Sequence, residues 1–158
     1  MRRRKIAKTD LDGAIEELAL GADQRTLATW AADCAVRVLP HFEEVSPDDT
    51  RPRDAITALR TWIKTGVFHM AEVRKVSLAA HAAARSVEEN DSARSAARAA
   101  GQALATAHVP RHAFAAALYA ATAVRDSAPL EDAETAALGE REWQYRHLQD
   151  LIKGQIPG

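Results

Sequence analysis

The sequence predicts an all-α protein, a compact bundle of six to eight helices with an alanine-rich core. Alanine makes up 22 of the 58 residues from Ala71 to Ala128, and alanine has the highest intrinsic helix propensity. Aromatic residues are only 5% of a chain that is 47% hydrophobic, whereas a β-sandwich core would need more aromatic and β-branched residues. No segment alternates apolar and polar residues between turn signals, so no strand is predicted.

Two helices are predicted at the start of the chain. The first covers about residues 9–21, and its cap is a threonine or aspartate. Asp23 caps the second helix, which should break or kink at Pro40, after about Val38, because proline cannot donate the intrahelical hydrogen bond. A buried stripe follows the three-and-four spacing of this second helix: Leu27, Trp30, Ala31, Cys34, Val38 and Phe42.

Residues 43–50 are acidic and contain a proline, so they predict an exposed loop. A third helix follows to about residue 65, with Pro52 in its first turn and Gly66 just past its end. The fourth helix is predicted over about residues 69–87.

The second half of the chain predicts three more helices. The fifth covers about residues 91–107, and Pro110 opens the sixth, which reaches about Asp126. Pro129 opens the last helix, which Gly139 should break or weaken. The side chains expected to face inward on the sixth helix are Phe114, Leu118, Ala121 and Val124.

One folded domain, residues 9–158, is predicted behind a flexible basic arm, residues 1–8. The basic side chains of the arm are Arg2, Arg3, Arg4, Lys5 and Lys8. The rest of the chain then holds 16 basic and 22 acidic residues, although the whole chain has a net charge of −1. A nucleic-acid binder would carry a clustered basic face on its folded part, so the sequence disfavours that class.

Several other classes are also disfavoured. No apolar stretch reaches the roughly 20 residues of a membrane span, and the basic N-terminus lacks the apolar run of a signal peptide. The single cysteine, Cys34, excludes an internal disulfide, fits a cytoplasmic protein and is expected to be inert packing. No glycine-rich phosphate loop or nucleophile motif is present. We therefore predict no cofactor, and an enzyme is not the favoured class.

Isolated polar residues stand in the three alanine-rich helices and could converge if those helices are neighbours. Gly101 in a helix interior costs about 1 kcal/mol relative to alanine, which indicates the close approach of another helix or of a ligand. The candidate ligand-binding residues are His81, Arg85, Arg98, Gln102, His108, His112 and Tyr119. The alternative is that each is hydrogen-bonded within the bundle or exposed.

Two finer hypotheses concern this group. His108 and His112 have the i,i+4 spacing of a metal-binding pair, but Pro110 lies between them at a helix boundary, so no metal site is predicted. The other hypothesis is a polar cavity that includes Arg98. A buried arginine there would need a partner such as Asp33, Glu142 or a bound anion.

Five stretches of sequence have a specific order and spacing. They are Trp30–Ala35 with Val38–Pro40, Asp49–Ile56 with Trp62, Ala80–Arg85, Ala99–Ala103 with Ala107–Val109 and His112–Ala113, and Arg141–Gln144. Together they resemble a family of small all-helical bacterial proteins labelled putative immunity proteins, which is associated with polymorphic toxin systems. The resemblance covers about residues 27–148. It implies a cytoplasmic protein that neutralises a partner toxin by binding it.

Three hypotheses for function stay open. The first is a toxin-binding protein whose acidic loop, residues 43–50, offers an acidic patch to a basic enzyme. The alternative for this loop is a solvated connection between helices. The second hypothesis is a small-molecule-binding or resistance protein with a His/Arg/Gln pocket between helices. The third is a small enzyme that uses His81 or His108 for acid–base chemistry. Pairing with a second copy also stays open. The candidate partner-binding residues are Glu43, Glu44, Asp48 and Asp49.

Overall fold

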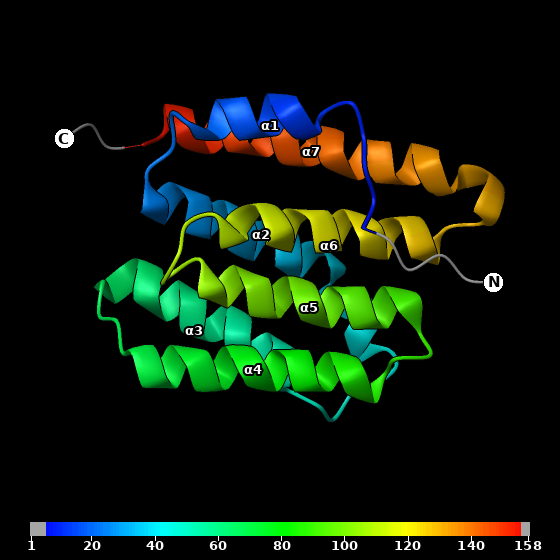
Figure 1. Ribbon diagram of the computed structural model, residues 1–158, viewed down its shortest axis with the longest axis horizontal. Coiled ribbons are helices and arrows are strands. Elements are labelled where there is room, and N and C mark those ends of the chain that lie inside the picture. Colours follow the sequence, from blue (N-terminus) through cyan, green and yellow to red (C-terminus); the bar gives the residue numbers. More distant parts are fainter. Residues whose placement is uncertain (1–5, 156–158) are drawn as a thin grey trace.

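The computed structural model describes residues 6–155, which form seven α-helices and a 3₁₀ turn (Figure 1). The predicted all-α bundle of six to eight helices is confirmed, and the described residues contain no strand. The helices are α1 (Asp12–Ala19), α2 (Gln24–Glu43), α3 (Arg51–Thr65), α4 (Met70–Ser86), α5 (Asp91–Ala105), α6 (His112–Ser127) and α7 (Ala133–Lys153), with the 3₁₀ turn η1 (Leu130–Asp132) before α7.

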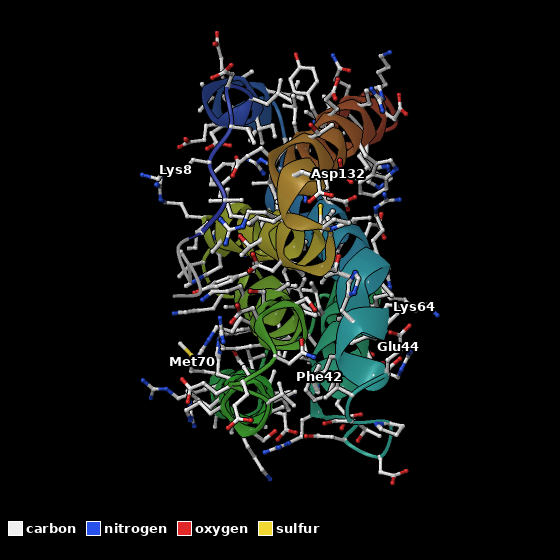
Figure 2. All side chains as sticks on the ribbon, turned by 90° about the vertical axis from the view of Figure 1, so that its right-hand side faces the viewer. Lys8, Phe42, Glu44, Lys64, Met70 and Asp132 are labelled. Carbon is white, nitrogen blue, oxygen red and sulfur yellow. The ribbon has the colours of Figure 1, made fainter. Side chains whose placement is uncertain are left out.

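The helices pack in two layers. α4, α5 and α6 lie side by side in one layer, and α2 and α3 lie behind them (Figure 1). α7 packs on α2 and α6, and α1 lies on α7. Figure 2 shows Lys8 and Met70 on the α4–α6 side of the bundle, and Lys64 and Glu44 on the α2–α3 side. α5 therefore lies at the centre, in contact with α2, α3, α4 and α6.

Three helix ends follow local sequence signals. The Asp23 carboxylate accepts the backbone N–H of Thr26 (2.8 Å) and caps α2 as predicted. Asn90 caps α5 in the same way, because its side chain accepts the N–H of Ala93 (2.9 Å). Gly66 has a φ of 71°, the left-handed conformation that ends α3.

The predicted break of α2 after Val38 is wrong. The helix continues through Pro40 to Glu43. Pro40 is exposed and stands near the helix end, so its ring faces solvent and only one backbone hydrogen bond is lost. The side chain of Phe42 is fully buried and holds the last turn against the core.

α7 is continuous through Gly139. This glycine is exposed, and the two residues that follow it form ion pairs with two other helices. Glu140 binds Arg37 of α2 (2.8 Å), and Arg141 binds Asp12 of α1 (2.9 Å). Tertiary ion pairs therefore offset the low helix propensity of the glycine.

The inward face predicted for α6 is only partly correct. Ala121 is buried, and Phe114 and Val124 are half-buried and pack against the core, whereas Leu118 is half-buried only. α6 packs against α2, α5 and α7, so most of its surface faces another helix. Small side chains fill those contacts, namely Ala113, Ala116, Ala117, Ala120 and Ala123.

Small side chains also explain how α5 can be enclosed by four helices. The distance between packed helix axes depends on the side chains at the contact, and alanine allows the closest approach apart from glycine. The alanines of α5 with 0% exposure are Ala93, Ala96, Ala97, Ala99, Ala100 and Ala103. A strip of half-exposed positions remains on this helix after its first turn, and it consists of Arg98, Gln102 and Ala105.

Buried hydrogen bonds connect α2, α6 and α7. The indole Nε1 of Trp30 donates to the carbonyl oxygen of Gln144 (2.9 Å). The Gln144 amide donates to the carbonyl of Ala117 (2.9 Å) and accepts from Arg141 Nη1 (2.8 Å). Each buried donor and acceptor of this Gln144 group thus has a partner, as buried polar groups require.

Cys34 is fully buried on the predicted stripe of α2. Burial raises the pKa of its thiol well above the ordinary value, and the charges of Glu140 and Asp33 raise it further. A protonated, buried thiol behaves as a small apolar side chain. The structure therefore agrees with packing as the role of Cys34.

The predicted basic arm is described only in part. Arg2, Arg3, Arg4 and Lys5 lie outside the described residues. Ala7 is buried, and its backbone N–H donates to Oγ1 of Thr122 on α6 (2.9 Å). Figure 1 shows this segment descending from α1 to α6. Among residues 6–155, no helix is long and apolar enough to cross a membrane.

Candidate functional site

Four of the predicted site residues meet where α4, α5 and α6 lie side by side. Arg98 Nη1 donates to Nδ1 of His81 across α4 and α5 (3.1 Å). His112 Nδ1 donates to Oε1 of Gln102 across α5 and α6 (2.7 Å). We call His81, Arg98, Gln102 and His112 the α5 cluster. The small residues of α5 let α4 and α6 approach closely, so the side chains of these helices can form hydrogen bonds with those of α5.

Gly101 is the reason that His81 fits against α5. A Cβ added at Gly101 would lie 2.8 Å from Nε2, 3.0 Å from Cε1 and 3.1 Å from Cδ2 of the His81 ring. The Ser77 hydroxyl also donates to the carbonyl of Gly101 (2.9 Å). The close approach predicted from this mid-helix glycine is thus that of α4, with an imidazole in the space that a side chain would occupy.

The electrostatics of the α5 cluster favour neutral imidazoles. Burial lowers the pKa of His81, and the charges of Arg98, Arg85 and His112 lower it further. Burial also lowers the pKa of His112, with a smaller effect of His108. Arginine is only a donor, so Nδ1 of His81 must be the unprotonated acceptor. Neutral His81 then carries its proton on Nε2.

The other predicted ligand residues stand at the margin of the α5 cluster or outside it. Arg85 is exposed one turn beyond His81 and is near enough to affect its pKa. His108 is exposed, and its ring stacks on Phe68 with centroids 5.8 Å apart. Tyr119 is half-buried and packs against the hydrophobic core. The proposed arginine partners lie elsewhere, since Asp33 binds Arg60 and His147, and Glu142 is exposed.

The acidic loop between α2 and α3 divides its carboxylates into two kinds. Glu43 binds the Arg53 guanidinium through both oxygens (2.7 and 2.6 Å), and Asp49 binds Arg51 (2.9 and 2.8 Å). These hydrogen bonds lower the pKa of each carboxyl. Glu44 and Asp48 are exposed, and neither forms an ion pair with the residues that the structure describes.

The same end of the bundle carries a second acidic segment. An open depression of about 640 Å³ lies between Val45–Ser46 and Arg85–Asn90. The α4–α5 turn therefore borders the α2–α3 loop, although the whole of α3 and α4 lies between them in the sequence. We call the exposed carboxylates of these two segments the acidic end: Glu44, Asp48, Glu88 and Glu89.

A row of charged and aromatic side chains on α2 and α7 is not predicted by the sequence. The Arg37 guanidinium lies 3.9 Å from the centroid of the Trp143 ring and also binds Glu140. Trp143 stacks on His147 (centroids 4.7 Å apart), and Nε2 of His147 lies 2.7 Å from Oδ2 of Asp33. The one signal in the sequence is a tryptophan within a charged run, because its partners come from a helix about a hundred residues earlier.

The two groups offer different chemistry. Within residues 6–155, no group of three or more His, Cys, Asp or Glu side chains could hold a metal ion. The α5 cluster offers hydrogen-bond donors and neutral imidazoles, and the acidic end offers exposed negative charge.

A family model described as Imm-5 like putative immunity protein matches residues 18–151. The chain belongs to this family. The match includes all of α2–α6 and most of α7, and with them both the α5 cluster and the acidic end. It confirms the resemblance found in the sequence, and immunity-protein membership implies toxin neutralisation. No curated protein and no solved structure matches the chain significantly.

The first prediction concerns the coupling between Gly101 and His81. Gly101→Ala in a His81→Ala background should stabilise the protein by roughly 0.5–1 kcal/mol, since only helix propensity changes. In the parent the same substitution should give no gain, because the new Cβ displaces the imidazole and breaks its bond to Arg98. Urea unfolding of the four proteins measures the coupling.

Gly139→Ala is the matched control for this cycle. Gly139 is also helical, but a Cβ there would meet nothing within 4 Å. This substitution should stabilise both backgrounds by the same amount. An equal gain from Gly101→Ala with and without His81 would show that the imidazole does not depend on the glycine.

The second prediction concerns pH. The pKa of folded His81 lies below its ordinary value of 6.5, so between those values the unfolded chain binds more protons than the folded chain. The free energy of unfolding must then rise with pH through this window and fall on acidification. His81→Gln should reduce the loss of stability between about pH 7 and about pH 5. Urea unfolding at both values tests this, and an unchanged loss would contradict it.

Proposed function

We propose that this protein binds and neutralises a toxin encoded beside its own gene, in the cytoplasm of the cell that makes both. Membership of an immunity-protein family over residues 18–151 supports the activity. The acidic end supports the mode of binding, because exposed negative charge attracts a basic partner and accelerates the encounter. We infer that Glu44 and Asp48 make the leading contacts with the toxin.

The acidic loop is ordered before any partner arrives. The bidentate Glu43–Arg53 pair links the end of α2 to the start of α3, and the Asp49–Arg51 pair fixes the turn between them. Binding then costs little additional chain entropy. In this proposal Glu43 and Asp49 shape the loop, while Glu44 and Asp48 meet the partner.

An apolar residue stands among these carboxylates. Val45 is 46% exposed and borders the depression shared with the α4–α5 turn. Protein interfaces combine a water-excluding apolar centre with a charged rim. Val45 and the carboxylates around it together have the composition of a small interface. Glu88 and Glu89 add negative charge at its edge.

The third prediction tests this surface. The double variant Glu44→Gln/Asp48→Asn should slow association with the toxin encoded beside the gene by about tenfold at low salt, because it removes two steering charges. The difference should shrink at high salt, where exposed charges are screened. Stopped-flow or surface-based binding measures the rates, and coexpression tests protection of growth.

The control is Glu16→Gln/Glu17→Gln on α1, which changes the net charge equally and lies on another face of the molecule. The control should keep the parent's association rate. Equal slowing by both double variants would assign the effect to net charge and not to the acidic end. A parent protein that neither binds nor protects against this toxin would refute the function itself.

A further inference from the structure

Arg98 differs from the arginines that form ion pairs in the described chain. Those arginines bind carboxylates, and they are Arg37, Arg51, Arg53, Arg60, Arg94, Arg125 and Arg141. Arg98 donates instead to an imidazole nitrogen of His81. Its positive charge is therefore held in place by a neutral partner and is not compensated by a nearby carboxylate among the described contacts.

Hydrogen-bond donors remain available at this position. A guanidinium has five N–H groups, and the described residues occupy only Nη1 of Arg98. One turn away, Gln102 uses its Oε1 to accept from His112, and its NH₂ group has no partner among the described residues. Both residues lie on the half-exposed strip of α5, so a ligand can reach these donors from solvent.

The two donors are also oriented by their neighbours. His81 holds the Arg98 guanidinium and is seated in the space left by Gly101. His112 holds the Gln102 amide from the opposite side, on α6. Side chains fixed in this way lose little rotamer freedom on binding, which is the usual basis of a preorganised site.

We propose that Arg98 and Gln102 form a binding site for a small oxyanion, a carboxylate or phosphate group, on the α5 strip between α4 and α6. The free edge of the guanidinium suits a group with two adjacent oxygens, and the Gln102 amide donates to one of them. Arg85, one turn beyond His81, adds positive potential without a required contact. Arg85 also lines the depression of the acidic end, but Arg98 and Gln102 do not, so the existence of this site does not depend on toxin binding.

The test is an NMR titration of the full ¹⁵N-labelled chain with inorganic phosphate and, separately, with acetate, at constant ionic strength set by chloride. The Arg98 Nε–H and the Gln102 side-chain amide should shift and saturate with at least one anion. Saturation with phosphate alone identifies a phosphate-bearing ligand, and saturation with acetate alone identifies a carboxylate. Linear shifts with both anions, without saturation, would overturn the proposal.

Variants decide whether the shifts report this site. Arg98→Gln should weaken binding at least about tenfold, the effect expected from losing charged hydrogen bonds. Arg98→Lys keeps the positive charge but loses the planar edge of the guanidinium, so the loss of affinity should be smaller. This variant also tests the site if the glutamine variant fails to fold. Arg146→Gln, an exposed arginine on α7, should bind as the parent does. Equal weakening by Arg146→Gln would show a non-specific effect of charge and overturn the site.

Discussion

The structure depends on the close approach of four helices to α5. That helix packs against α2, α3, α4 and α6, and such enclosure requires side chains that add little radius at every contact. Alanines satisfy this requirement along most of α5, and glycine satisfies it at the one position where an imidazole from α4 occupies the contact. The alanine content is therefore a packing requirement as well as a source of helix propensity.

One consequence is that, after its first turn, α5 presents polar side chains to solvent along one strip. Beyond that first turn the remaining faces of α5 are covered, so Arg98 and Gln102 are its polar side chains that reach both a neighbouring helix and solvent. The acidic end arises differently, from two loops that meet where α2 and α4 terminate. The two surfaces therefore have opposite charge, and Arg85 borders both of them, whereas neither Arg98 nor Gln102 lines the depression of the acidic end.

Local signals in the sequence predicted the fold well, and long-range contacts account for what they missed. Asp23 and Gly66 end helices through bonds within a few residues, so sequence alone suffices there. Pro40 was expected to stop α2, but burial of Phe42 beyond it outweighs one lost hydrogen bond. For the site, spacing on a helix predicted which side chains share a face. It could not show that Tyr119 packs against the core, or that Trp143 contacts Arg37.

Substituting leucine at two alanines of α5 tests directly whether small side chains set the distances between the helices. Ala100 is 0% exposed, whereas Ala105 is half-exposed on the strip, and leucine and alanine have similar helix propensities. Urea unfolding should show that Ala100→Leu lowers the free energy of unfolding by about 1–3 kcal/mol through overpacking, while Ala105→Leu stays within about 0.5 kcal/mol of the parent. An Ala100→Leu protein as stable as the parent would contradict the claim that small side chains on α5 hold the four helices at their distance.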